Sequence, residues 1–230
     1  AIMNIQEILD RVKQHQDINY KKFSEKIIKE KKLIGVRTPV LESISASIIK
    51  DDPLSYLDHY KKNCYEMDLI YGFVMAKSDL SIEKRILYCD NFISLIDNWC
   101  VCDQTVARCK WMRKENNQII LDYLQKHLNT KNVWHQRFVY VSLLDHFLNE
   151  KNLHQIFCFC DYPFQHEYYV QMAVAWLLSM AIVKYPEQTK TYLQNSTLDT
   201  FTYNKTLQKA CESKQISKEE KMILRKMKRK

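Results

Sequence analysis

Trp99 and Asp103 are the two residues of this 230-residue sequence whose types and spacing most directly suggest chemistry. They stand four positions apart, so a helix over residues 99–112 would place the indole and the carboxylate on one side. A carboxylate beside an aromatic face is typical of a site that holds a cation. The simpler interpretation is a core tryptophan near a surface aspartate, in a helix that Asp97 or Asn98 caps at its start.

Arg137 and Trp176 are possible partners for this pair later in the sequence. Arg137 stands among apolar neighbours. It either extends from a core helix toward solvent or lies on a concave face, where it could bind a phosphate or hold a carboxylate. Trp176 belongs to so apolar a run that burial is the default expectation. Trp111 and Trp134 are also predicted to be core residues. The open question is whether Arg137, Trp176 and the Trp99–Asp103 pair form one cleft or make separate core contacts.

Glycine is unusually scarce, because the chain holds only Gly35 and Gly72 where average usage predicts about sixteen. Glycine-rich phosphate loops, tight hairpins and Rossmann turns need glycine, so the sequence excludes them. Apolar residues make up 46% of the chain, which is ordinary for a globular protein with a substantial core. No apolar run approaches the roughly 20 residues that span a bilayer, so we expect no membrane association.

The eight cysteines include no Cys-x-x-Cys pair, and no two histidines have metal-ligand spacing. We therefore expect no metal site and no cofactor. None of the histidines has a suitably placed Ser or Cys partner, so a hydrolytic triad is not predicted. The N-terminus lacks a secretory signal pattern, and Met3 is the expected natural start. The sequence thus predicts a cytoplasmic protein with reduced, mostly buried thiols.

Positive charge is concentrated at the end of the chain. The net charge is +8, and residues 217–230 carry seven Lys or Arg and two Glu, which accounts for five of those eight charges. We expect a basic C-terminal helix or tail there. A basic balance permits contacts with nucleic-acid phosphates, although solvated lysine faces are common.

Apolar residues recur with helical spacing along the whole chain, and no segment alternates as a strand would. Cap-and-proline signals at Thr38-Pro39 and Asp52-Pro53 predict two helix starts. The pattern indicates an all-α protein of roughly a dozen helices in recurring pairs, which usually stack into a curved solenoid. A compact irregular α-bundle is the alternative. No linker-like stretch divides the chain, so a single domain over residues 1–230 is expected.

Four stretches give the sequence a family resemblance. Residues 35–39, 98–103, 134–137 and 169–176 occur in the order and at separations similar to those of the AlkD-type DNA alkylation repair family, the HEAT-like-repeat DNA glycosylases. The resemblance covers about residues 4 to 215. It implies a right-handed superhelix of HEAT-like helical repeats with a concave, basic face for double-stranded DNA. It also implies a monomer that hydrolyses the N-glycosidic bond of cationic alkylpurines, such as 3-methyladenine and 7-methylguanine, without flipping the base.

The resemblance also implies a role for each candidate residue. Asp103 would be the catalytic carboxylate, which stabilises an oxocarbenium-like sugar and positions or activates water. Trp99 and Trp176 would be aromatic walls beside the damaged nucleotide, and Arg137 would contact the backbone phosphate. A cationic purine is already a good leaving group, so one carboxylate suffices and neither metal nor cofactor is required.

The sequence departs from the family pattern in two places. Active members tend to carry Arg-Glu three and four residues after the second tryptophan, where this chain has Ser179 and Met180. Residues 17–33 also differ from the N-terminal helix with which active members approach the DNA groove. Some branches of the superfamily keep the fold but lack excision activity. The alternative is therefore a non-catalytic HEAT-like-repeat protein that binds DNA or another protein and has a vestigial cleft.

Overall fold

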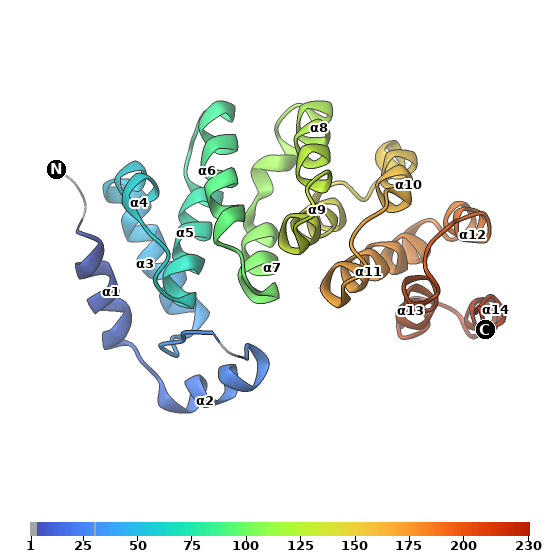
Figure 1. Ribbon diagram of the computed structural model, residues 1–230, viewed down its shortest axis with the longest axis horizontal. Helices are drawn as coiled ribbons and strands as arrows, with labels where there is room; N and C mark the ends of the chain where they lie inside the picture. The colour runs from blue at the N-terminus through green and yellow to red at the C-terminus, as the bar shows by residue number, and fades with distance from the viewer. Residues whose placement is uncertain (1–3, 30) are drawn as a thin grey trace. The chain divides into compact units, whose positions relative to one another are not determined.

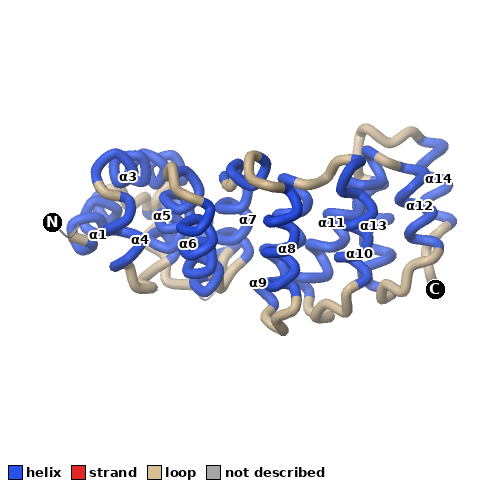
Figure 2. Tube along the Cα trace, turned by 90° about the horizontal axis from the view of Figure 1, so that it is seen from above, coloured by secondary structure: helices blue, strands red, loops and turns tan. Residues whose placement is uncertain are grey.

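The computed structural model describes residues 4–29 and 31–230, and in these residues the chain forms fourteen α-helices, two short 3-10 segments and no strand. Figure 2 shows the same content as helices joined by loops. The all-α prediction is confirmed, while the expected start at Met3 lies outside the described residues. The chain divides into two compact units, Ala1–Trp111 and Met112–Lys230. The single-domain expectation stays a prediction.

The first unit is built around one central helix. α5 packs against α3, α4, α6 and α7, and Figure 1 shows it between α3 and α7. The helices of this unit are α1 (Ile5–Gln14), α2 (Ile18–Ile27), α3 (Thr38–Asp51), α4 (Pro53–His59), α5 (Tyr65–Lys77), α6 (Ile82–Leu95) and α7 (Trp99–Arg108).

Every residue of α5 except the last, Lys77, is buried. Gly72 lets α7 approach this helix closely, because a Cβ added at Gly72 would lie 2.1 Å from the Thr105 hydroxyl oxygen. One of the two glycines therefore sets how near the candidate α7 residues lie to the core of the first unit.

The predicted helix starts are correct at one proline signal and wrong in detail at the other. Asp52 caps α4, and its side chain accepts a hydrogen bond from the Ser55 amide at 3.1 Å. Thr38 does not cap α3: the N-cap residue is Arg37, and it makes no side-chain cap bond. The Thr38 hydroxyl instead donates to Gln104 Oε1 on α7 at 3.2 Å. The hydroxyl that the local pattern predicted as a cap therefore makes a tertiary contact.

The second unit is built around α11, which packs against α9, α12 and α13. Its α-helices are α8 (Asn117–Leu128), α9 (Val133–His146), α10 (Leu153–Asp161), α11 (Tyr168–Lys184), α12 (Pro186–Gln194), α13 (Thr200–Cys211) and α14 (Lys218–Lys226). The 3-10 segments are η1 (Lys110–Arg113) and η2 (Glu150–Asn152).

The basic C-terminal segment forms the predicted helix, α14, which packs against α13. Beyond it, the Arg229 guanidinium lies 3.8 Å from the centre of the Tyr203 ring and donates to the carbonyls of Leu198 and Ser196. Asn204 exchanges two 2.9 Å hydrogen bonds with the Arg229 backbone. Part of the positive charge at the chain end therefore holds the C-terminus against α13.

Six of the eight cysteines are buried, as expected, and Cys158 is exposed. Burial raises the pKa of the Cys64 thiol to about 11, so it packs as a neutral side chain. In the described part of the chain, no helix combines the length and the apolar character needed to cross a bilayer. In the same residues, no group of three or more His, Cys, Asp or Glu side chains is placed to hold a metal ion.

Candidate functional site

The N-terminal half of α7 presents Trp99 and, one turn later, Asp103 on its accessible side. Both side chains are half-buried, whereas the intervening Cys100, Val101 and Cys102 are buried. The i and i+4 spacing thus has the effect predicted for it, because the indole and the carboxylate share a side of the helix while the residues between them pack into the unit. The arrangement suits a group that carries positive charge.

Asn98 fixes the start of this helix. Its Oδ1 accepts a hydrogen bond from the Val101 amide at 3.0 Å, and its side chain is only 5% exposed. Its Nδ2 donates to Asp97 Oδ1 at 2.9 Å. Of the two capping residues that the sequence left open, Asn98 is therefore the cap, and Asp97 holds the Asn98 side chain by accepting its hydrogen bond.

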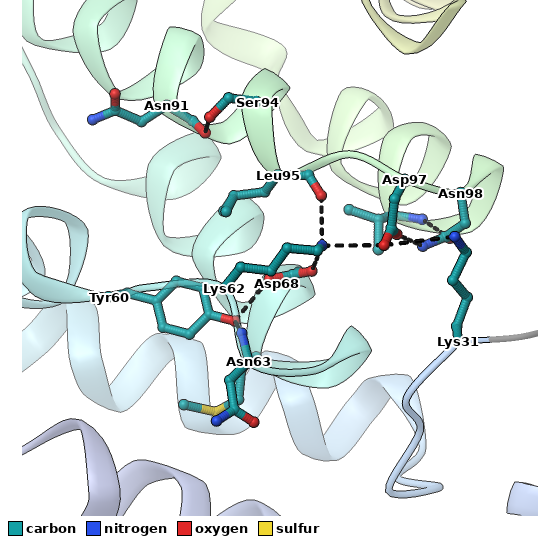
Figure 3. A network of polar contacts seen from close by, with 12 residues as sticks. Lys31, Tyr60, Lys62, Asn63, Asp68, Asn91, Ser94, Leu95, Asp97 and Asn98 are labelled. Carbon is teal, nitrogen blue, oxygen red and sulfur yellow. Dashed lines mark hydrogen bonds and ion pairs between the residues drawn. The ribbon is translucent and has the colours of Figure 1, made fainter.

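Asp97 connects the cap to an ion-pair network, which Figure 3 shows in close-up. Its carboxylate lies 3.3 Å from the Lys62 ammonium and 3.6 Å from that of Lys31. Lys62 also pairs with Asp68 at 2.5 Å and donates to the Leu95 carbonyl at 2.8 Å. The link between α6 and α7 is thus held at both ends by one lysine, which limits how far the first turn of α7 can move.

The pKa values in this network follow from burial and from the charges that face one another. Burial raises the pKa of Asp68 above its usual value, although hydrogen bonds from Lys62 and Tyr60 act in the other direction. For Lys62, burial favours the neutral form, but the Asp68 contacts and the Asp97 charge leave its pKa raised. Burial also opposes ionisation of Asp97. The Asn98 hydrogen bond and the Lys62 and Lys31 charges outweigh it, so the pKa of Asp97 is lowered.

The loop before α3 is held by a buried carboxylate. Glu66 on α5 accepts hydrogen bonds from the amides of Ile34 and Gly35, each at 2.9 Å, and of Val36 at 3.4 Å. Gly35 has φ +91°, and a Cβ there would lie 2.4 Å from the Lys21 Cβ. Glycine is required at this turn because other residues rarely adopt that φ and would also clash.

Two further contacts orient α7 within the first unit. Gln104, next to Asp103, donates to the Tyr65 hydroxyl at 3.0 Å and accepts from Thr38. Near the end of the helix, Arg108 pairs with Glu42 on α3 at 2.7 Å. The hydrogen bond from Arg108 is the main cause of a lowered Glu42 pKa. α3 and α5 together therefore position the helix that carries Trp99.

Arg137 lies in the second unit and is 7% exposed. Its Nη1 donates to the Tyr169 carbonyl at 2.7 Å, and its guanidinium lies 5.9 Å from the centre of the Tyr169 ring. The side chain is mostly buried and ties α9 to α11, so it does not extend toward solvent, which was the first of the two interpretations that the sequence left open. A contact with a DNA phosphate stays a prediction.

Trp176 is 36% exposed, so the default expectation of burial was wrong. Its neighbours Ala175 and Leu177 are buried. The uniformly apolar run hides the fact that one side of α11 is left uncovered within its unit. Ser179 is 4% exposed and donates to the Trp176 carbonyl at 2.7 Å, whereas Met180 is half-buried. The departure at Ser179 therefore lies in the packed side of the helix.

The two remaining tryptophans differ. Trp111 is buried at 4% exposure, as predicted. Trp134 is half-buried rather than a core residue, and its ring centre lies 5.1 Å from that of Tyr169. Its place at the second position of α9 puts it at the end of the helix, where fewer elements can cover a side chain.

Trp99 and Asp103 belong to the first unit, and Arg137 and Trp176 belong to the second. The structure brings the first two together on α7, and that all four act at one site stays a prediction. Sequence reasoning missed the supporting residues Glu66 and Asp68. A signal for them was available, since two acidic residues interrupt the apolar run that forms α5.

One comparison with known proteins is informative. A family model described as "DNA alkylation repair enzyme" matches residues 8–215. The matched range contains all four candidate residues and ends before α14. No curated protein matches the chain.

Proposed function

The chain belongs to the DNA alkylation repair enzyme family, and from this premise we propose that it is an alkylpurine DNA glycosylase. Its substrates are cationic adducts, such as 3-methyladenine and 7-methylguanine, in double-stranded DNA. Water adds to C1′ of the sugar as the C1′–N bond breaks. The bond electrons neutralise the departing base, and the water proton passes to solvent. The base is not flipped into a pocket, unlike in most glycosylases.

One carboxylate is enough for this chemistry because the base is already positively charged. Its departure needs no strong general acid, and the transition state places developing positive charge on the sugar. Asp103 is the residue that we assign to stabilise that charge and to position or activate the water. No step requires a metal or another cofactor.

The other three residues bind and position the damaged nucleotide. Trp99 and Trp176 supply aromatic faces, which attract a cation through the ring quadrupole. Arg137 donates a 2.7 Å hydrogen bond to the Tyr169 carbonyl and so steadies α11, the helix that carries Trp176. It also contacts a backbone phosphate. This assignment requires the two pairs of residues to meet at one DNA site.

The proposal includes the finer fold that such a site needs: a right-handed superhelix of HEAT-like repeats with a concave, basic DNA-binding face. Consecutive packed helices within each unit, such as α5 with α6 and α8 with α9, support it. The proposal also takes the protein to be a cytoplasmic monomer.

The observation that carries the proposal is the placement of Trp99 and Asp103. They share the accessible side of α7, while a buried cap and an ion-pair network hold the start of that helix. Rigid support of this kind is what a catalytic carboxylate needs, because a loosely held group loses most of its electrostatic effect.

The test is release of 7-methylguanine from methylated duplex DNA. Asp103→Asn keeps the size of the side chain but removes its charge, so release should fall to the spontaneous rate while DNA binding stays nearly unchanged. Asp10→Asn is a matched control, because Asp10 is an exposed carboxylate on α1 outside the candidate site. Equal release by wild type and Asp103→Asn would remove the catalytic assignment.

A second candidate function follows from the departure after Trp176. With Ser179 and Met180 in place of the Arg-Glu of active members, the chain lacks charged residues that they carry there. The alternative is therefore a helical-repeat protein that binds DNA or another protein through a vestigial cleft. Wild-type protein would then release no alkylbase above the spontaneous rate, whereas clear turnover would exclude this alternative.

A further inference from the structure

Four aromatic side chains form a continuous row in the second unit. Centre-to-centre distances between neighbouring rings are 5.1 Å from Trp134 to Tyr169, 5.3 Å from Tyr169 to Tyr168, and 6.5 Å from Tyr168 to Phe201. We refer to these four residues as the aromatic row. The base-excision chemistry described above uses none of these rings.

The row is built by the first turns of three neighbouring helices. Trp134 and Phe201 are the second residues of α9 and α13, and Tyr168 and Tyr169 are the first two residues of α11. α11 packs against both other helices, and Figure 1 shows the three in succession. Because all four residues belong to helix starts that pack side by side, the row has a defined place in the fold.

The outer end of the row is open to solvent. Tyr168 is 55% exposed and Phe201 is 42% exposed, while Trp134 and Tyr169 are half-buried. Aromatic rings bury a large apolar area when they are packed, so rings left exposed contribute little of that stabilisation to the fold. Single exposed apolar residues are common, but a continuous group of rings is typical of a binding surface.

One lysine and two carboxylates lie near the row. The Lys205 ammonium lies 5.7 Å from the centre of the Phe201 ring and 3.1 Å from Gln208 Oε1. Two nearby carboxylates serve as helix caps: Glu167 accepts from the Tyr169 amide at 2.8 Å, and Asp199 accepts from the Thr202 amide at 3.0 Å. These two carboxylates are engaged by amides at the helix starts, and the Lys205 ammonium beside the exposed Phe201 ring is placed to contact a phosphate.

We infer that the aromatic row binds single-stranded DNA. Unpaired bases stack on Tyr168 and Phe201, and Lys205 contacts the backbone phosphates. Rings that stack on bases, with cationic side chains that contact the backbone, are how proteins bind single strands with little sequence preference, since every base has a π face. A duplex keeps its base faces stacked inside, so it cannot use the rings in this way. This inference goes beyond the proposed base excision, because it requires neither an alkylated base nor Asp103.

The test measures fluorescence anisotropy of a labelled oligodeoxythymidylate of about 16 nucleotides, the upper end of usual site sizes. Thymidine carries no alkylpurine, so the result does not depend on glycosylase activity. Loss of one stacking ring should weaken binding about fivefold or more in Phe201→Ala and in Tyr168→Ala. Tyr168→Phe keeps the ring and should bind as wild type does. Lys205→Gln should flatten the salt dependence.

Two variants control for effects on folding. Phe201→Leu keeps an apolar side chain for local packing but has no ring, so it should lose affinity as Phe201→Ala does. Phe157→Ala removes another ring from the same unit, one stacked on Tyr192 at 4.4 Å and outside the row, and it should bind normally. The inference is overturned if wild type does not bind the oligonucleotide, if the ring-deleted variants bind it as wild type does, or if they lose as much affinity for an undamaged duplex.

Discussion

Replacing Asn98 with alanine should loosen the start of α7 more than an ordinary cap deletion would. The side chain provides the acceptor for the Val101 amide at 3.0 Å and a donor to Asp97 at 2.9 Å. Alanine provides neither. Because Trp99 and Asp103 lie within five residues of this cap, the substitution tests the support of the candidate site without altering either residue.

The expected magnitude follows from burial. Loss of a helix cap costs typically about 1 kcal/mol, within a range of roughly 0.5–2 kcal/mol. Asn98 is 5% exposed and Val101 is fully buried, so water cannot readily replace the lost acceptor. An unsatisfied buried amide adds a desolvation cost. We therefore expect a loss at the upper end of the range, about 2 kcal/mol.

Asn116 provides the matched control. Its side chain caps α8 by accepting from the Ile119 amide at 3.1 Å, but Asn116 and Ile119 are exposed. Water can replace this cap, so Asn116→Ala should cost about 1 kcal/mol or less. Asn98→Ser retains a hydroxyl acceptor and should recover much of the loss at α7.

Hydrogen exchange followed by mass spectrometry measures both helices in one experiment. A loss of about 2 kcal/mol corresponds to exchange roughly thirtyfold faster in the peptide that covers α7, and about 1 kcal/mol to roughly fivefold in the peptide that covers α8. Release of 7-methylguanine should fall in Asn98→Ala and recover in Asn98→Ser. Unchanged exchange at α7, or equal acceleration at α7 and α8 in their respective variants, would refute the reasoning from burial.

Two further predictions concern the first unit. Gly35→Ala should lower the urea midpoint by an amount equivalent to about 2 kcal/mol or more, because the residue has φ +91° and the new Cβ would lie 2.4 Å from the Lys21 Cβ. An unchanged midpoint would contradict that. The folded-state pKa of Asp97 is lowered, so its ion pairs stabilise the fold above about pH 4, the usual value for Asp. The stability advantage of wild type over Asp97→Asn should be present at pH 6 and disappear as the pH falls below about 4. A difference that persists in acid would argue against the pairing.

Local signals predicted the helices well because their causes are local. Asp52 and Asn98 cap helices as their residue types suggest, and apolar spacing marked the helices of both units. Thr38 shows the limit of this reasoning. Its hydroxyl could cap α3, but a residue on α7, far away in the sequence, takes the hydrogen bond.

The candidate site was predictable only in part. The i and i+4 spacing of Trp99 and Asp103 was enough to place them on one side of α7. Exposure was harder to infer, because the sequence around Trp176 is uniformly apolar and yet one side of α11 is open within its unit. Trp134 was also expected in the core, but it lies at a helix start against Tyr169.

The sequence by itself determined the all-α class, individual helix caps such as Asp52 and Asn98, and the pairing of an indole with a carboxylate on one helix, because these depend on residues within a few turns of one another. Tertiary structure alone decided which buried groups support that helix. The carboxylates of Glu66 and Asp68 find their partners in separate loops. It also decided which aromatic rings remain exposed. Burial depends on neighbours that are distant in the chain, and no local pattern records them.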